Sequence, residues 1–566
     1  MILFGALKGY FFSKNNIPLF LVFLFSTNVN GQVDKSSLLY VDCRLSADCA
    51  GNYSILNRDC SGTDGNSYSG LANAMAVAKP GDKVLIRGGV YSEQLRPQHS
   101  GEKDHYITIR NYPGETVEIS GASLSPAIWL DQKDYIIIEG LEIRNVSRWL
   151  NALGSDFLIL RNNVFEKAID LGGSSKTGIF LQGCHHTEIL NNKLHDTTQD
   201  NLALVDSDYN LIEGNTFTKA VHALWALKCS NYNILRNNYF HNELQKIGEI
   251  YDCDGVGYGE GEFPKVVSLD DSKCNIVEHN TFAYTASSGD ASPYAGIQYA
   301  GQNGIIRNNV FFECIGPPID LTLYADEAMY NYGNRIYHNT FYHNDFGGIS
   351  ISSGLSHTFC DQRLKNNLWY KNRFIQNDKR WVWYAELDQK PVQILAGRID
   401  GIHFESNNIG SHADVYSIAF GVRTSSSNPS PESLTWWESN YPWAFKNNVQ
   451  ANPRFVNPLN HDFHLQQNSP MVDSGTFLTN AIRKGISSTV MEVEDARWFS
   501  DGFGITTGDT VQLDGQTEHA VIISIDYKSK ILVLDNALTW DAGCGVTLKY
   551  SNKGPDIGAY EFINNN

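Results

Sequence analysis

The sequence has few basic residues, few cysteines and no long apolar run beyond its first segment. It holds 44 Lys and Arg against 62 Asp and Glu in 566 residues, a formal net charge of −18. A chain this acidic is a poor candidate for binding nucleic acid or an anionic membrane, and an anionic polysaccharide would need a locally basic groove. No Cys or His pair has the spacing of zinc ligands. The chain is therefore an acidic protein that is long enough to bury a large core.

The N-terminal segment, 1–31, has the features of a secretory signal peptide. Lys8 and Lys14 precede an apolar stretch over 17–25, which is too short for a membrane span, and small residues lead to an expected cleavage after Gly31. No Cys stands at the new N-terminus, so a lipid anchor is not expected. We therefore predict an exported monomer, secreted or periplasmic, that binds neither membrane nor nucleic acid.

The ten cysteines do not form the framework of a small disulfide scaffold. In an oxidising compartment, one disulfide is expected among Cys43, Cys49 and Cys60, near the mature N-terminus. Cys229 and Cys253 could tie down the base of an insertion between two strands.

One short phrase recurs eight times along the chain: an aliphatic residue, an Asn three positions later and a large apolar residue two positions after that. Most copies are 23 to 30 residues apart, and one interval is 42 residues. This period is typical of a solenoid of short strands and turns. We predict that each Asn tolerates left-handed turn geometry and hydrogen-bonds to the Asn of the next coil, while the apolar residue points inward. The recurring residues are Asn163, Asn192, Asn215, Asn238, Asn280, Asn309, Asn339 and Asn367.

The rest of the chain is arranged around this solenoid. A short helix over 69–78 is expected to cap the open end of the first coil, which would otherwise expose strand edges. Two insertions interrupt the coils, and a small β module is inserted before the last strand. In chain order, the predicted parts after the signal peptide are the cap and first coils 32–121, the parallel β-helix 122–487 with insertions 241–263 and 374–446, the β module 488–553 and the closing strand 554–566.

Four segments carry a family resemblance: GDKVLIRGGVYSE (81–93), ITIRNYPGETVEISG (107–121), SPMVDSG (469–475) and PDIGAYEF (555–562). They resemble secreted right-handed parallel β-helix proteins, a group that includes polysaccharide lyases, some glycoside hydrolases and epimerases. The resemblance covers nearly the whole mature chain and implies an all-β fold and a carbohydrate-active enzyme. These phrases belong to the scaffold, so they do not indicate one reaction. The lysine–arginine arrangement of the chondroitinase B and alginate lyase family is not evident, and the aspartate and Gly-His-Gly motifs of polygalacturonases are absent.

Aligning the strands coil by coil predicts a charged patch on one face. The strands 222–228, 266–271, 295–299 and 319–324 are taken as four consecutive coils. A charged patch on a strand face that otherwise carries small or apolar residues indicates a functional site. A cross-strand ion pair on a solvated sheet is the simpler alternative. The outward residues of these coils are Lys228, Asp270, Gln298, Asp320 and Tyr324, with His222 at a strand entrance and Gln182 on an earlier coil.

The first chemistry that fits this patch is β-elimination on a uronate-containing polysaccharide or oligosaccharide. The reaction needs a base for the proton α to the carboxylate and a cation for the developing enolate charge. Lys228, His222 or Tyr324 could be base or acid. A lyase results if the leaving group is a sugar, and an oligosaccharide dehydratase results if it is water. Possible calcium ligands are Asp252, Asp254, Asp270 and Asp271.

Two other functions stay open. Asp270 and Asp320, about 10 Å apart by coil count, could act as an inverting glycoside hydrolase pair. A non-catalytic carbohydrate-binding solenoid is also possible, although a uniform polar or aromatic stripe would suit it better than a charged centre. Gln298 and Gln182 are candidate substrate-binding residues. Trp381 and Trp383 could form a sugar-stacking wall or pack their insertion onto the solenoid.

Overall fold

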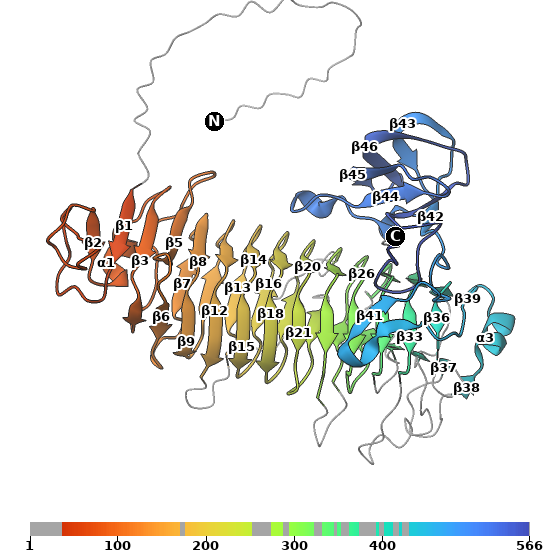
Figure 1. Cartoon of the computed structure of the whole chain (residues 1–566), viewed down its shortest axis with the longest axis horizontal. Helices are drawn as coiled ribbons and strands as arrows, with labels where there is room; N and C mark the ends of the chain where they lie inside the picture. Colours follow the sequence, from red (N-terminus) through yellow and green to blue (C-terminus); the bar gives the residue numbers. More distant parts are fainter. Residues whose placement is uncertain are drawn as a thin grey trace, which may run out of the picture. The chain divides into compact units, whose positions relative to one another are not determined.

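The three-dimensional structure, a computed structural model, describes residues 37–169, 176–251, 273–286, 294–321, 331–344, 348–351, 361–372, 392–394, 401–410, 418–420 and 430–564. In these residues the chain winds as a parallel β-helix, and each full coil contributes one strand to each of three sheets (Figure 1). The predicted all-β fold is therefore confirmed. None of the helices within the described ranges combines the length and the hydropathy of a membrane span.

The first sheet begins at the N-terminal cap and continues to the last coil. Its strands are β1 (Leu38–Val41), β2 (Asn66–Tyr68), β3 (Lys83–Ile86), β5 (Ile107–Asn111), β8 (Ile136–Glu139), β11 (Ile159–Arg161), β14 (Glu188–Leu190), β17 (Leu211–Glu213), β20 (Ile234–Arg236), β23 (Ile276–Glu278), β26 (Ile305–Arg307), β29 (Arg335–Tyr337), β32 (Gln362–Lys365), β35 (Ile402–Glu405) and β39 (Phe445–Lys446).

The second sheet is parallel except where its last two strands, β37 and β38, pair antiparallel. Its strands are β7 (Ile128–Asp131), β10 (Leu150–Leu153), β13 (Ile179–Gln182), β16 (Leu202–Val205), β19 (Trp225–Lys228), β22 (Gly248–Tyr251), β25 (Ile297–Tyr299), β28 (Ile319–Leu321), β31 (Ile349–Ile351), β34 (Val392–Ile394), β37 (Ile418–Phe420) and β38 (Ser430–Glu432).

The third sheet follows the Asn turn of each coil. Its strands are β4 (Gly89–Tyr91), β6 (Val117–Ser120), β9 (Glu142–Val146), β12 (Val164–Ala168), β15 (Lys193–Thr197), β18 (Thr216–Ala220), β21 (Tyr239–His241), β24 (Thr281–Ala283), β27 (Val310–Phe312), β30 (Thr340–Tyr342), β33 (Leu368–Tyr370) and β36 (Asn408–Ile409).

The recurring Asn residues form the predicted ladder inside the turn between the first and third sheets. Asn238, for example, donates from Nδ2 to the Ile212 carbonyl at 2.9 Å and to Oδ1 of Asn280 at 3.0 Å. The left-handed residue is the one before each ladder Asn, such as Asn237 with φ 56°. The prediction that the ladder Asn itself takes the left-handed conformation was therefore wrong: the Asn contributes hydrogen bonds, and its preceding neighbour makes the turn. The ladder also extends past the repeats, to Asn407 and Asn448.

The large apolar residues that follow the ladder point inward, as predicted. Consecutive rings lie 4.5–5.1 Å apart between their centroids. These stacked rings fill the interior of the coils and fix the vertical register between them. The stack contains Phe217, Phe240, Phe282, Phe311, Phe341 and Trp369.

The N-terminal end is capped by α1 (Leu71–Val77), in agreement with the predicted helix. Leu71, Ala74 and Met75 are buried in the core of the first coils, so the helix covers the edge of that core. A disulfide joins Cys49 to Cys60, as one of the expected pairings. Cys229 is also disulfide-bonded, and Cys253 lies outside the described residues.

After the last coils, the chain forms α3 (Leu434–Asn440), a short hairpin of β40 (Phe455–Asn457) and β41 (Asp462–Leu465), and an antiparallel module. This C-terminal module starts at β42, before the predicted boundary at residue 488. The short 3-10 helices are η3 (Pro458–Asn460), η4 (Ala496–Trp498) and η5 (Gly502–Gly504). The strands of the module are β42 (Thr479–Asn480), β43 (Gly485–Glu492), β44 (Thr510–Leu513), β45 (His519–Asp526), β46 (Ile531–Trp540) and β47 (Gly545–Leu548).

Buried ion pairs connect this module to the first sheet of the β-helix. Arg307 on β26 donates to both carboxylate oxygens of Asp509, at 2.7 and 2.6 Å, and also contacts Glu278. Removing one partner of such a buried pair leaves an uncompensated charge, so the module is tied to these coils.

Candidate functional site

The candidate site lies on the outward face of the second sheet, over the coils of β16, β19 and β22. The register of the strands places one outward residue from each strand in a single column that runs across successive coils. The column runs through Ala203, Ala226, Glu249, Gln298 and Asp320.

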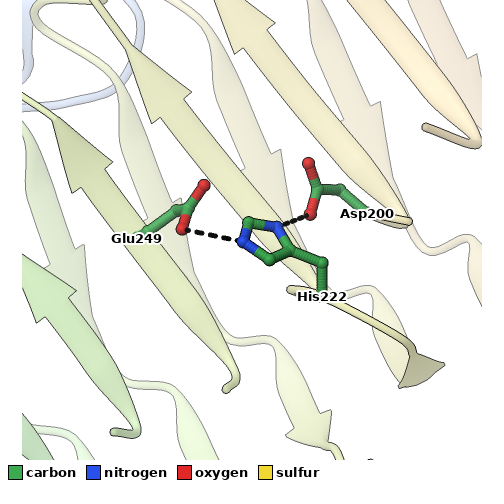
Figure 2. A group of neighbouring side chains, drawn as sticks. All are labelled: Asp200, His222 and Glu249. Atoms are coloured by element: carbon green, nitrogen blue, oxygen red, sulfur yellow. Dashed lines mark hydrogen bonds and ion pairs between the residues drawn. The ribbon is translucent and has the colours of Figure 1, made fainter. Parts of the chain in front are cut away.

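Asp200 and His222 stand just before β16 and β19, where two neighbouring coils enter the sheet. Oδ1 of Asp200 accepts hydrogen bonds from Nδ1 of His222 at 2.7 Å and from the Ala223 backbone N–H at 3.1 Å. The other ring nitrogen, Nε2, lies 3.9 Å from Oε2 of Glu249 (Figure 2). The His222 side chain is 29% exposed, whereas those of Asp200 and Glu249 are 2% and 0% exposed. The imidazole is thus oriented by a buried carboxylate and remains open to solvent.

Glu249, at the centre of β22, is a fully buried carboxylate compensated by two lysines. Lys246 forms an ion pair with Oε2 of Glu249, and Nζ of Lys228 lies 3.6 Å from Oε1. Burial acts to raise the pKa of Glu249, but the charges of Lys246, His222 and Lys228 together hold this pKa below its ordinary value. Glu249 is therefore ionised and holds two ammonium groups beside the imidazole.

The next coils extend this polar cluster along the same column. Nζ of Lys246 donates to Oε1 of Gln298 on β25 at 3.3 Å. Asp320 on β28 follows Gln298 in register. The cluster therefore combines an accessible imidazole, two ammonium groups and three carboxylates, which can bind an acidic group and transfer protons beside it.

The structure brings together some of the residues predicted for the site. Lys228 and His222 meet around Glu249, and Gln298 and Asp320 lie on the following coils. Gln182 aligns with Lys228 two coils earlier, through Val205. The remaining candidates fall outside the described residues: Tyr324, Asp270, Trp381, Trp383, Asp252, Asp254 and Asp271.

The predicted alignment of the coils was wrong at one point. The strand that pairs with both β19 and β25 is β22, and not the segment 266–271. The insertion predicted at 241–263 thus includes a regular strand, and Glu249 was missed for this reason. The period could have shown it, because the strands that begin at Ile179, Leu202, Trp225 and Gly248 follow each other at intervals of 23 residues.

Asp200 and Lys246 were missed for a different reason. Both lie before their strands, where alternation along a strand does not predict the direction of a side chain. His222 could have indicated that the site draws on strand entrances, since it also stands before its strand. A search of each strand entrance for charged residues would have found all three positions.

Asp200, His222 and Glu249 also meet the spacing of a metal site, with one ligand atom from each within 4.8 Å of the others. Ca²⁺ prefers a shell of oxygen ligands, and this group offers one nitrogen. Lys246 and Lys228 already place positive charge on the Glu249 carboxylate, so a cation here would compete with them. The described cluster therefore does not fit calcium.

Comparison with protein families supports the type of fold. A family model described as "Pel9A-like, right handed beta helix region" matches residues 56–222. The match covers less than half of the chain, and it includes Asp200 and ends at His222. The resemblance to polysaccharide-lyase-like, right-handed β-helix proteins is thus confirmed, without a more specific family match.

Individual relatives are distant or partial. The chain is 40% identical to the uncharacterized protein YwoF of Bacillus subtilis (strain 168) over 92 residues, 15% of this chain. It spans only 20% of the length of that relative. The structure of pectate lyase Pel9A is 12% identical, with 93% of this chain and 96% of that chain covered and a TM-score of 0.42. A mutant of the PL6 family alginate lyase AlyGC is 15% identical, with 70% and 54% covered and a TM-score of 0.42. At these levels of similarity, no residue role can be transferred.

Proposed function

We propose that this protein is an exported carbohydrate-active enzyme that acts by β-elimination on a uronate-containing, anionic polysaccharide or its oligosaccharides. The observation that carries the proposal is the exposed imidazole of His222, oriented by Asp200 at 2.7 Å and adjoining the Lys246–Glu249–Lys228 cluster. A base beside two fixed cations is what the reaction requires. The Pel9A-like β-helix region supports the same class of enzyme.

His222 is the proposed base. Because Asp200 accepts the Nδ1 proton, Nε2 carries the lone pair and can take the proton α to the uronate carboxylate. Asp200 is a positioning residue that fixes the ring and its tautomer. The pair of electrons released from the C–H bond forms the new C=C bond as the β C–O bond breaks.

Lys228 is the proposed electrostatic partner of the substrate. Its side chain is 13% exposed against 8% for Lys246, and its Nζ is farther from Glu249. The ammonium can therefore approach a uronate carboxylate and stabilise the charge that develops there as the proton leaves. Lys246 stays with Glu249 and Gln298 and keeps this part of the cluster rigid.

The leaving oxygen must receive a proton, and the imidazolium formed at His222 or the Lys228 ammonium can supply it. If that oxygen belongs to a sugar, the chain is cut and the enzyme is a lyase. If the oxygen is a hydroxyl, water leaves and the enzyme is a dehydratase. Both reactions use the same base and the same cation.

Hydrolysis by paired carboxylates is the second candidate, because Glu249 and Asp320 share one column two coils apart. Two coils correspond to about 10 Å, at the upper edge of the range for an inverting pair. A general acid needs a raised pKa, whereas the two lysines lower the pKa of Glu249. This electrostatic mismatch favours β-elimination.

The test is to incubate the mature protein with pectate, alginate and glycosaminoglycans and their oligosaccharides, and to follow ultraviolet absorbance and product mass. New absorbance without addition of water establishes elimination, and loss of one water from an intact chain identifies a dehydratase. Products that gain water without new absorbance would overturn the proposal in favour of hydrolysis. Binding without any product across the panel would favour a carbohydrate-binding solenoid.

A further inference from the structure

We infer that an anionic polysaccharide extends from the Glu249 cluster along the second sheet toward the N-terminal coils, where two arginines held over aromatic rings bind its carboxylates. The two pairs are Arg148 with Phe180 and Arg96 with Trp129. This inference rests on the proposed function, because it names the length and charge of the substrate at the same face.

Phe180 lies in the same outward column as Glu249. The register passes from Phe180 through Ala203 and Ala226 to Glu249, so the two residues are three coils apart. At one strand spacing per coil, the separation is about 14 Å. A sugar unit in an extended polysaccharide advances about as far as one coil, so Phe180 is about three sugar units from the centre.

Among the described residues, Phe180 and Asn151 help to hold Arg148 at this distance. Its guanidinium carbon lies 5.3 Å from the centroid of the Phe180 ring, and Nη1 donates to Oδ1 of Asn151 at 3.2 Å. A guanidinium supported on a ring is oriented without losing its charge, and its N–H groups can bind a carboxylate in a bidentate manner. The ring thus positions the arginine, which is the group that contacts the sugar.

The second pair repeats this arrangement nearer the cap. Trp129 on β7 precedes Phe180 by two coils in the same column, through Asn151. The guanidinium carbon of Arg96 lies 5.8 Å from the Trp129 ring centroid, and Arg96 is exposed. Trp129 is five coils from Glu249, about 24 Å. An arginine held over an aromatic ring therefore occurs twice along one column of the sheet.

This path supplies a locally basic surface on a chain whose net charge is −18. Arg96 and Arg148 lie on the coils of β7, β10 and β13, and Lys176 stands just before β13, with Nζ bonded to Oγ of Ser125 at 2.9 Å. Within these three strands, the acidic side chain is Asp131, at the end of β7. These three cations attract a polyanion locally, whereas the net negative charge of the whole chain repels it.

The experiment compares Arg148→Gln and Arg96→Gln with a matched control, Arg161→Gln, which removes the same charge from β11 on the first sheet. Binding and turnover are measured with oligogalacturonates and oligoalginates of increasing length, and with neutral dextran. We expect Arg148→Gln to weaken binding and raise KM about tenfold, only for chains that reach beyond about three units from the centre. Arg96→Gln should act only on still longer chains. Phe180→Leu should reproduce part of the Arg148 effect, because the guanidinium loses its support.

Equal effects of Arg148→Gln and Arg161→Gln, or effects that do not depend on chain length, would overturn the inference. The binding measurement does not require turnover, so it separates the two proposals. Length-dependent binding through Arg148 without any elimination product would reject the proposed function and retain the path. Elimination with no length dependence would retain the function and reject the path.

Discussion

The carboxylate of Asp200 and the imidazole of His222 are joined across one coil of the β-helix by a hydrogen bond of 2.7 Å. Each residue stands just before a strand of the second sheet, so the rise of the solenoid itself sets their separation. A buried carboxylate at Nδ1 leaves Nε2 as the basic nitrogen. Substitutions in this pair therefore test the proposed chemistry most directly.

Asp200→Asn is expected to lower kcat about 100-fold or more with little change in KM, because the ring loses its tautomer and orientation but Lys228 remains. His222→Gln should lower kcat by about 10²–10⁴-fold. Steady-state kinetics on the substrate identified by the polysaccharide panel measure both effects.

The control for Asp200→Asn is Asp206→Asn, an exposed Asp at the other end of the same strand. Its kinetics should match those of the wild type. A fall in melting temperature of Asp200→Asn with an unchanged kcat would show that Asp200 has only a structural role.

Glu249→Gln should destabilise the protein by about 3–5 kcal/mol, because Lys246 would remain buried without a countercharge. Lys246→Met on its own should also destabilise, and the double variant should lose less than the sum of the two. Urea unfolding of the four proteins measures this coupling. Additive losses would mean that the two side chains do not interact.

The acid dependence of this pair follows from the lowered pKa of Glu249. A carboxyl group whose pKa is lower in the folded state stabilises the protein above its unfolded pKa, and this contribution is lost as the pH falls through the folded value. The acid limb of the stability curve should therefore be shallower in Glu249→Gln than in the wild type. Parallel acid limbs would contradict the charge assignment.

Removal of metal tests which centre is active, because the sequence and the structure point to different centres. The cluster around Glu249 is compensated by Lys246 and Lys228, so activity based on it should survive EDTA unchanged. Calcium bound by Asp252, Asp254 and Asp271 would instead make activity fall with EDTA and return with Ca²⁺. The measurement is the initial rate of the metal-stripped enzyme with and without added Ca²⁺, and loss with recovery would reject a metal-independent centre.

The fold could be predicted because the interior is repeated. The Asn ladder and the stacked rings recur at each coil, so eight copies of one phrase specify both the period and the inward face. The site could be predicted only in part, because it depends on which strand fills one place in the stack. Glu249 lies in a short strand with few apolar residues, directly before a long insertion, and periodicity gives a weak signal there. Asp200 and Lys246 lie at strand entrances, where the register of the next coil decides which residues they meet.

The Asn ladder should be sensitive to a single truncation. Asn238→Ala removes the donor to the Ile212 carbonyl and the acceptor for the backbone N–H and side chain of Asn215. The Asn215 side chain keeps the carbonyls of Ile189 and Glu213 as acceptors. The Asn215 backbone N–H and the Ile212 carbonyl each lose a partner at a cost of about 1–3 kcal/mol, so a loss of at least about 2 kcal/mol is expected from urea unfolding. Asn237→Gly is the matched control, since Asn237 is exposed at φ 56° and Gly accepts that geometry. Equal losses in the two variants would show that the turn, and not the ladder, supplies the stability.

The closing segment 554–564, where the structure has no strand although one was predicted, should make the protein less stable as the pH rises. Burial and the charge of Asp556 raise the pKa of Glu561 to about 8, and burial raises the pKa of Asp556 to about 6. A carboxyl group whose pKa is higher in the folded state favours folding below its unfolded pKa, and this contribution is lost as the pH rises through the folded value. The melting temperature should therefore contain a component that falls between about pH 4 and pH 8 and is constant above.

Glu561→Gln is expected to remove most of that component above pH 6, because the amide does not ionise. The variant should also be about 1 kcal/mol less stable at pH 5, since Glu561 accepts backbone N–H bonds from Asp556 and Ser551 and an amide nitrogen cannot replace both acceptors. Thermal unfolding at several pH values measures the slope, with the exposed Glu518→Gln as a control for the change in net charge. If Glu561→Gln and the wild type lose stability in parallel from pH 6 to pH 8, Glu561 ionises as an ordinary carboxyl group and the closing segment does not respond to pH.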